Sequence, residues 1–221
     1  MNAPARTFLG FAVGSLLIAA MVCSPAAAAS PAAAAPAAGS AAATPPCEAC
    51  HGAHGEGMAA AHVPRIAGQD AGYLQKQLDA YADGTRDNPI MRNFAKALSK
   101  RQRTEFAARY AAMSAPYSPQ AKPQNPTDLA RGHQLAYQGD EANRVQACNG
   151  CHGPDGVGVA QSSPYLAGQS AEYLASALKA FKDGTRKNDA GQSMRSIAER
   201  LDDADIAAVA AYFASVDAST H

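Results

Sequence analysis

Apolar residues recur at helical spacing in both halves of this chain, and no stretch alternates as a half-buried strand would. One mostly apolar face comprises Tyr73, Leu74, Gln77, Leu78 and Tyr81, and the matching face of the second half comprises Tyr173, Leu174, Ala177, Leu178 and Phe181. A later helix follows in each half, with Phe106, Tyr110 and Met113 on one and Ile206, Val209 and Phe213 on the other. The pattern therefore predicts an all-α fold.

Start and stop signals delimit these helices. Asp70 and Ser170 are placed to cap the first helix of each half, and Gly84 and Gly184 are placed to end it. Ahead of the later helices, Ser99 with Gln102 resembles a capping box, and we expect Asp202 with Asp205 to act similarly.

A helix is also expected at the start of each half. In the second half Thr127 is placed to cap a helix from Asp128 to Tyr137. In the first half Pro45 and Pro46 are tolerated in a first helical turn but not in a helix interior, so the opening helix should be short and begin near Thr44.

The two halves repeat one another in sequence. Residues 66–69 (Ile-Ala-Gly-Gln) return as 166–169 (Leu-Ala-Gly-Gln), and residues 83–86 (Asp-Gly-Thr-Arg) return unchanged about 100 residues later. That period is too long for a solenoid unit and indicates two copies of one domain, at 44–113 and 127–221. Residues 114–126 contain four prolines and form the predicted linker, biased towards extended polyproline II.

The first 43 residues are expected to lie outside both domains. Residues 1–29 have one charge, an apolar run from Phe8 to Val22 and an Ala-rich cleavage region, which together predict a secretory signal peptide. Retention of this segment as a membrane anchor stays open. Residues 30–43 are almost entirely small residues and proline, and we expect a disordered tether.

Two C-x-x-C-H pentads carry the chemistry. Residues 47–51 and 148–152 match the attachment motif of c-type haem, in which two thiols add to the haem vinyl groups and the histidine binds the iron. The pattern predicts two covalent haems, one on Cys47 and Cys50 and the other on Cys148 and Cys151. Zinc or redox C-x-x-C sites are the alternatives, but neither pentad has a second Cys/His pair at finger spacing. The fifth cysteine, Cys23, lies in the leader.

The proximal iron ligands are then His51 and His152, and the repeat selects candidates for the second axial position. Met91 and Met194 recur in matching contexts, 40 and 42 residues after the respective histidines. Met58 and Met113 align with valines instead, so we expect Met91 and Met194 to bind the irons. Core filling is the alternative role of a methionine.

Other recurring residues suggest supporting roles. Pro64 and Pro164 precede the Ala-Gly-Gln segments, where a carbonyl could accept the proximal imidazole N–H, although a simple turn is an equal alternative. Arg86 and Arg186 recur, as do Tyr73 and Tyr173; they could bond haem propionates or the domain interface, although a solvated helix end is an equal alternative for the arginines.

Charge adds one distinction between the halves. The whole chain has no net charge, so nothing points to nucleic acid. From 47 to 113 there are nine basic and seven acidic residues, a net +2, whereas from 127 to 221 there are eight and twelve, a net −4. We expect this asymmetry to steer redox partners, with Asp202, Asp203 and Asp205 at the acidic end; helix capping is the alternative role of these acids.

The chain resembles the di-haem cytochromes of the c4 type, which consist of two fused class I cytochrome c domains. The resemblance covers roughly residues 44–217 and is carried by both pentads, by the Asn-Pro-Ile-Met segment at 88–91 and by the repeated Ala-Gly-Gln and Asp-Gly-Thr-Arg segments. It implies His/Met ligation of both irons, a proline carbonyl on each proximal histidine and periplasmic electron transfer between a respiratory donor and an acceptor such as a haem–copper oxidase. Two departures are the short opening helix of the first domain and extra residues, including Gly191, before Met194.

Two other functions stay open at this stage. One is a cytochrome subunit of a membrane-bound dehydrogenase or oxidase, tethered through its N-terminal segment. The other is a di-haem redox enzyme, such as a peroxidase or a thiosulfate-oxidising cytochrome. A matched methionine in each half argues against the open iron site that a peroxidase needs, so a non-enzymatic electron carrier is the favoured interpretation.

Overall fold

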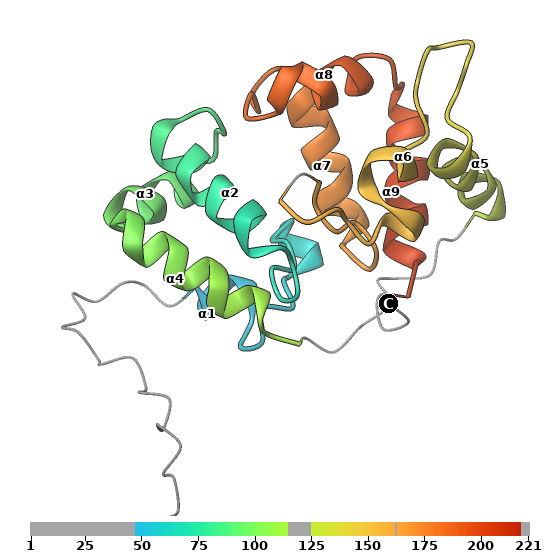
Figure 1. Ribbon diagram of the computed structural model, residues 1–221. Helices are drawn as coiled ribbons and strands as arrows, with labels where there is room; N and C mark the ends of the chain where they lie inside the picture. The colour runs from blue at the N-terminus through green and yellow to red at the C-terminus, as the bar shows by residue number, and fades with distance from the viewer. Residues whose placement is uncertain (1–46, 115–124, 162, 218–221) are drawn as a thin grey trace, which may run out of the picture. The chain divides into compact units, whose positions relative to one another are not determined.

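The computed structural model describes residues 47–114, 125–161 and 163–217. The described residues form helices joined by turns, and their strand-like pairings are only isolated bridges (Figure 1). The all-α prediction is therefore confirmed. The leader, the tether and linker residues 115–124 lie outside the described residues.

The two halves fold into similar helical domains. The first domain comprises α1 (Glu48–His51), η1 (Ala59–Ala61), α2 (Ala71–Asp83), α3 (Pro89–Ala97) and α4 (Lys100–Ala111). The second comprises α5 (Pro126–Tyr137), α6 (Asn149–His152), η2 (Pro154–Gly156), α7 (Ala171–Lys182), η3 (Ala190–Gln192), α8 (Ser193–Ala198) and α9 (Asp203–Ser215). Among the described helices, none is both long enough and apolar enough to cross a bilayer.

Most predicted helix boundaries are confirmed. The Asp70 and Ser170 side chains accept the N–H groups of Tyr73 and Tyr173, and Gly84 ends α2 in the left-handed conformation. Ser99 and Gln102 form the reciprocal capping box of α4. In the second domain α7 ends at Lys182 with Asp183 as its cap, so Gly184 lies one residue beyond the cap.

The predicted cap of α5 is wrong. The helix begins at Pro126, and the Asn125 side chain accepts the N–H of Thr127 at 3.0 Å. Asn125 is the stronger cap because Pro126 after it occupies the first helical turn, where its missing N–H costs nothing.

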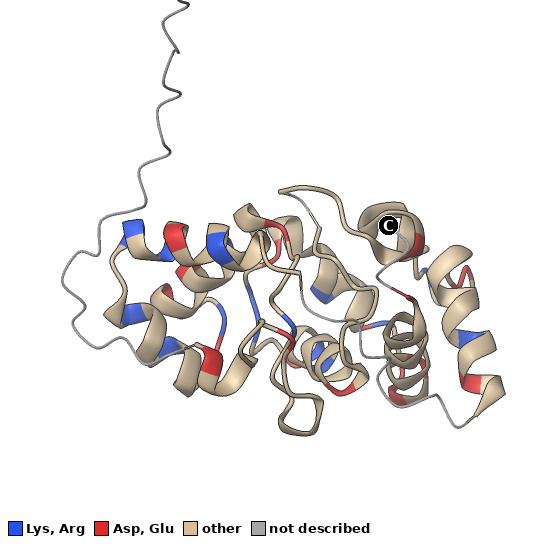
Figure 2. Ribbon diagram, turned by 90° about the horizontal axis from the view of Figure 1, so that it is seen from below, with Lys and Arg blue, Asp and Glu red and all other residues tan. Residues whose placement is uncertain are grey.

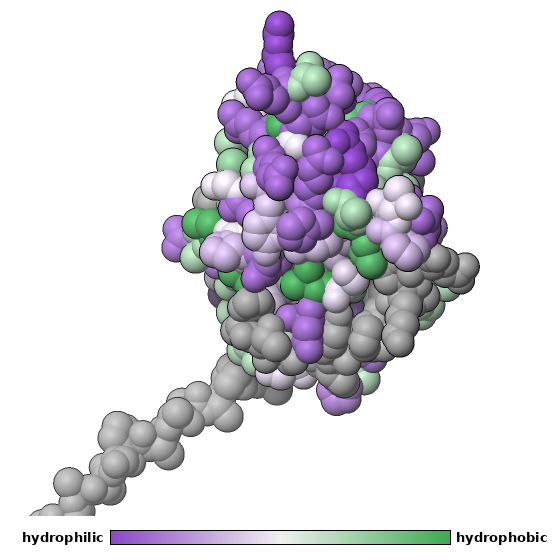
Figure 3. Space-filling model, turned by 90° about the vertical axis from the view of Figure 1, so that its right-hand side faces the viewer, coloured by the Kyte–Doolittle hydropathy of each residue, from purple (hydrophilic) through white to green (hydrophobic). Residues whose placement is uncertain are grey.

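The second domain is built on the close contact of α5 with α9. At Gly132 an added Cβ would lie 2.3 Å from the carbonyl oxygen of Ala208, so only glycine permits this approach. Leu135 and Ile206 are completely buried there. The face of the molecule on the right of Figure 1, seen head-on in Figure 3, is mostly hydrophilic with separate small apolar areas.

The first domain presents polar residues at the α4 positions that correspond to this contact. Where α9 has Ala208 and Tyr212, α4 has Glu105 and Arg109. Arg109 binds Glu48 at 2.8 Å and so ties α4 to the pentad. The predicted start of a short opening helix near Thr44 lies outside the described residues.

One backbone contact holds the repeated Ala-Gly-Gln segment on the last helix of both domains. The Gly68 N–H donates to the Tyr110 carbonyl at 3.1 Å, and the Gly168 N–H donates to the Phe213 carbonyl at 2.9 Å. The repeated segment therefore makes the same tertiary contact in both domains.

Candidate haem sites and the domain interface

Each pentad forms one turn of helix with a buried histidine at its end. Cys47 and Cys148 directly precede α1 and α6 and are half-buried, whereas Cys50 and Cys151 are exposed. All four thiols are free of disulfides. His51 and His152 are each only 7 % exposed. Two accessible thiols beside a fixed imidazole are the donor set that covalent haem requires.

A proline carbonyl fixes each imidazole. Nδ1 of His51 lies 2.9 Å from the carbonyl oxygen of Pro64, and Nδ1 of His152 lies 3.0 Å from that of Pro164. The carbonyl can only accept, so Nδ1 carries the proton and donates it. This tautomer leaves Nε2 as a lone-pair donor for iron. Burial lowers the pKa of both histidines, which keeps the imidazoles neutral.

Glycines close the loop that brings each proline back to its histidine. The N–H of Gly57 donates to the His51 carbonyl at 2.7 Å, and Gly158 makes the same bond to His152. A Cβ at Gly57 would lie 2.5 Å from the backbone nitrogen of Arg65, and both glycines have positive φ. A side chain here would displace the segment that carries the proline.

The thiols do not have the electrostatics of a redox C-x-x-C site. Reactive first cysteines of such sites have a depressed pKa. Burial instead raises the pKa of Cys47, and it raises that of Cys148 to about 11. Both groups are thiols rather than thiolates at neutral pH, which favours the haem interpretation over the redox one.

The two recurring methionines lie on equivalent short helices that are capped differently. In α3 the Asn88 side chain accepts the N–H of Met91 at 2.9 Å. The extra residues of the second domain form η3, in which Gly191 has positive φ, and Met194 follows in α8. Both methionines are half-buried, whereas Met58 is 48 % exposed.

Three further histidines among the described residues are exposed, His54, His62 and His133, and each lies on the surface. His133 stacks on Tyr137 with ring centroids 4.5 Å apart.

The repeated glutamines join the two domains reciprocally. Gln69 accepts the N–H of Tyr165 at 2.9 Å and donates to its carbonyl at 3.0 Å. Gln169 makes the same pair of bonds to the backbone of Arg65, both at 2.9 Å. Each buried side-chain amide thus makes, with one residue of the other domain, the pair of backbone hydrogen bonds that a neighbouring strand would make. The sequence signalled these residues by their recurrence, but their role was missed because the partners are backbone groups 96 and 104 residues away.

The arginines and tyrosines also belong to the interface. Arg86 donates to the Tyr173 hydroxyl at 2.8 Å, and Arg186 donates to the Tyr73 hydroxyl at 3.1 Å. These four residues therefore bond across the domain interface, which was one of the expected alternatives. Both arginines are more than nine-tenths buried and are oriented by the turn in which Asp83 or Asp183 accepts two bonds from a threonine.

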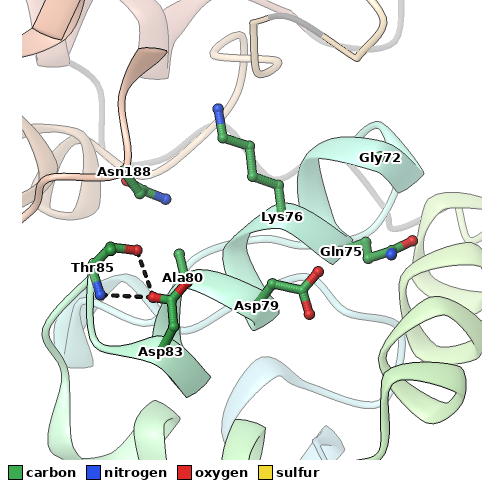
Figure 4. A pocket seen from close by; sticks show the side chains of 8 residues that line it. All are labelled: Gly72, Gln75, Lys76, Asp79, Ala80, Asp83, Thr85 and Asn188. Carbon is green, nitrogen blue, oxygen red and sulfur yellow. Dashed lines mark hydrogen bonds between the residues drawn. The ribbon is translucent and has the colours of Figure 1, made fainter. Parts of the chain in front are cut away.

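Gln77 is an interface residue that the sequence placed on the mostly apolar face of its helix without indicating this role. Its side-chain oxygen accepts bonds from Arg86 and Arg186, both at 2.9 Å, and from Asn188 at 2.8 Å. The equivalent position in the second domain is Ala177, so the repeat gave no signal. An open pocket beside this network contains Lys76 and Asp79 of α2 together with Asn188 from the other domain (Figure 4).

The expected role of Asp205 is partly wrong. Asp202 caps α9 by accepting the N–H of Asp205 at 2.7 Å, as predicted. The Asp205 carboxylate, however, is buried and binds Arg131 of α5 at 2.7 Å, while Arg131 also binds Asp140 at 2.6 Å. Asp205 therefore does not contribute to an exposed acidic surface, because its charge is neutralised inside the domain.

The comparisons with known proteins agree on one family. The cytochrome c family model matches this chain twice, at residues 36–131 and 129–217. The chain is 47% identical over 170 residues to "Thiosulfate dehydrogenase electron acceptor" of Stutzerimonas stutzeri, which covers 77% of this chain and 78% of that protein. It is 39% identical to "Cytochrome c4" of Pseudomonas aeruginosa, over 75% of this chain and 81% of that one.

Solved structures agree with these relatives. The fold superposes on cytochrome c4 from Pseudomonas stutzeri with a TM-score of 0.71 at 31% identity, covering 77% of this chain and 93% of that one. It also superposes on thiosulfate dehydrogenase from Marichromatium purpuratum with a TM-score of 0.73 at 37% identity. That match covers 78% of this chain but only 36% of the other.

Proposed function

Because this chain belongs to the cytochrome c family, as a di-haem protein of the c4 type, we propose that it accepts single electrons from a thiosulfate dehydrogenase and passes them to a second redox protein. Its two cytochrome c domains carry two covalent c-type haems, with the cysteine pairs at 47/50 and 148/151 as attachment points. A bound haem supplies a one-electron ferric/ferrous couple. The named donor is the part of this function that needs testing.

The residues around each site support a carrier. His51 and His152 are proposed as proximal ligands, because their Nδ1–H groups are held by the Pro64 and Pro164 carbonyls and their Nε2 atoms stay available. The carbonyl bond fixes the ring orientation and increases the basicity of the ligating nitrogen. Electron transfer needs little rearrangement when the ligands are held in this way.

Met91 and Met194 are proposed as the distal ligands. Their positions recur on equivalent helices, and thioether ligation favours ferrous iron and raises the reduction potential. A methionine on each iron would leave no coordination position for a small substrate. This is the reason for proposing a carrier rather than a peroxidase-type enzyme.

The similarity to two proteins named thiosulfate dehydrogenase electron acceptors, from different organisms, carries the proposed donor. The acceptor is proposed only as a second redox protein, of which a haem–copper oxidase is one candidate class. Function outside the cytoplasmic membrane is proposed from the signal-like leader at residues 1–29.

The direct test uses the purified, oxidised di-haem protein. Thiosulfate is added with and without a catalytic amount of thiosulfate dehydrogenase, and the haem absorption is followed anaerobically. We expect rapid reduction of both haems with the enzyme and negligible reduction without it. Reduction no faster than the uncatalysed background would reject this donor.

A second candidate is a permanent electron-accepting subunit of a dehydrogenase. It is favoured by the Marichromatium structure, in which a region similar to this chain forms part of a longer thiosulfate dehydrogenase. Size-exclusion chromatography of the two proteins at micromolar concentration distinguishes the candidates. Co-elution as a stable complex supports the subunit, whereas separate elution with fast turnover supports the mobile carrier.

A further inference from the structure

The interface glutamines bond to the same peptide units that hold the pentad histidines. The carbonyl of Pro164 accepts the Nδ1–H of His152 at 3.0 Å. The N–H of that same peptide unit belongs to Tyr165, and it donates to the side-chain oxygen of Gln69 at 2.9 Å. A peptide unit with a hydrogen bond at each end therefore connects Gln69 of the first domain to the histidine of the second.

The reverse connection has the same form. The carbonyl of Pro64 accepts the Nδ1–H of His51 at 2.9 Å. The Arg65 N–H belongs to that peptide unit and donates to the side-chain oxygen of Gln169, also at 2.9 Å. Each domain thus supplies the group that completes the support of the histidine in the other domain.

The surrounding bonds fix the orientation of both amides. The Gln69 oxygen also accepts the N–H of Asp70 at 3.1 Å, while its nitrogen donates to the carbonyl of Tyr165 at 3.0 Å. The Gln169 oxygen likewise accepts the N–H of Ser170 at 3.0 Å. A flipped amide would place its NH2 group against these N–H donors, so the oxygen must face the proline peptide.

This arrangement acts through dipoles rather than through charge. The two repeated segments, 64–69 and 164–169, contain one charged residue, Arg65, and it bonds Gln169 through its backbone (charged residues are coloured in Figure 2). Gln69 and Gln169 are both buried, so solvent competes little for their bonds. In such surroundings consecutive hydrogen bonds polarise and strengthen one another.

We infer that Gln69 and Gln169 are positioning residues that act across the interface, Gln69 on His152 and Gln169 on His51. The inference rests on the proposed function only in taking these histidines as iron ligands. An acceptor on a peptide N–H increases the negative charge of the carbonyl oxygen, because resonance links the two ends of the peptide unit. The carbonyl then draws the Nδ1 proton more strongly, and the ligating Nε2 becomes more basic.

The consequence is a coupling between domain contact and reduction potential. A more basic imidazole stabilises ferric iron, so each glutamine should lower the potential of the haem in the other domain. A purely structural role makes a different prediction. Loss of either glutamine would then weaken one shared interface and affect both domains alike.

The test compares Gln69→Met and Gln169→Met in the complete di-haem protein. NMR of the reduced, diamagnetic protein with isotope-labelled histidine follows the Nδ1–H protons, and an NMR-monitored redox titration separates the two potentials. For Gln69→Met we expect an upfield shift of the His152 Nδ1–H and a higher potential for the second haem only. For Gln169→Met we expect the same changes at His51 and the first haem only.

Two further variants separate this coupling from loss of the interface. Tyr73→Phe removes a different interdomain bond, that to Arg186, and should leave both Nδ1–H signals in place. Gln69→Glu retains an acceptor oxygen in either protonation state, so the His152 signal should stay at the parent position or move downfield. Equal shifts of both histidines, a shift only within the substituted domain, or no shift of His152 in Gln69→Met would overturn the inference.

The parent spectrum keeps this result separate from the proposed function. The ring protons of a histidine bound to haem iron are displaced far upfield by the ring current of the porphyrin. Undisplaced rings in the parent would reject the proposed ligation and the coupling with it. Displaced rings without the crossed effect would reject the coupling alone and leave the proposed function standing.

Discussion

Arg86 of the first domain and Arg186 of the second lie opposite each other in an antiparallel bridge across the domain interface. The backbone bonds on either side are reciprocal. The Asp87 N–H donates to the carbonyl oxygen of Thr185 at 3.2 Å, and the Lys187 N–H donates to that of Thr85 at 2.7 Å. Two buried guanidiniums at one interface repel, so the acceptors around them decide whether this arrangement is stable.

Gln77 is the acceptor that both guanidiniums share, and its removal should be costly. Gln77→Ala leaves two buried guanidinium donors and the partly buried Asn188 amide short of a partner, so we expect the free energy of unfolding to fall by about 1–3 kcal/mol. The measurement is chemical denaturation of the di-haem protein. Gln75→Ala, on the same helix beside the open pocket, is the control and should cost less than about 0.5 kcal/mol. Equal losses in the two variants would show that the shared acceptor has no special role.

Arg131 should contribute more to the stability of the second domain than its other partly exposed arginines. It bridges Asp140 and Asp205, whose side chains are 13% and 11% exposed. Arg131→Met leaves two carboxylates without their cation, and we expect a loss of about 1–3 kcal/mol in unfolding free energy. Arg101→Met is the control, because that arginine is 79% exposed in its pair with Glu105 and such pairs contribute below about 0.5 kcal/mol. A comparable loss in the control variant would contradict this assignment.

The same ion pair predicts an acid dependence of stability. Arg131 holds the pKa of Asp140 at about 2, below its value in an unfolded chain. The stabilisation is therefore complete above about pH 4 and is lost as the pH falls towards 2. Denaturation curves between pH 5 and 2 should show a steeper loss of stability for the parent than for Arg131→Met. Parallel curves would mean that the pair does not couple protonation to folding.

Local sequence patterns predicted the helices and the repeated sites because both depend on near neighbours. The Ser99 capping box and the Asp70 cap use groups three residues apart, and the two halves supported each other wherever a residue recurred. The cap at Asn125 was missed because Thr127 is also a suitable capping residue and only the proline between them decides the matter.

The interface was less predictable because its contacts join residues about 100 positions apart. Gln69 and Gln169 recurred, but nothing local indicates that their amides bond another domain's backbone. Gln77 had no counterpart at all. Asp205 looked like a member of an acidic cluster, since its partner Arg131 is 74 residues away in a different helix.

We propose that a methionine binds the haem iron of each domain, Met91 in the first and Met194 in the second, as an electron carrier requires. The most direct measurement is the weak near-infrared sulfur-to-iron band of the oxidised di-haem protein, recorded for the parent, Met91→Ala, Met194→Ala and the control Met58→Ala. Each ligand variant should lose about half of the band and show one lowered reduction potential, and the control should match the parent. A full band in Met91→Ala or Met194→Ala, or a loss in Met58→Ala, would contradict the account.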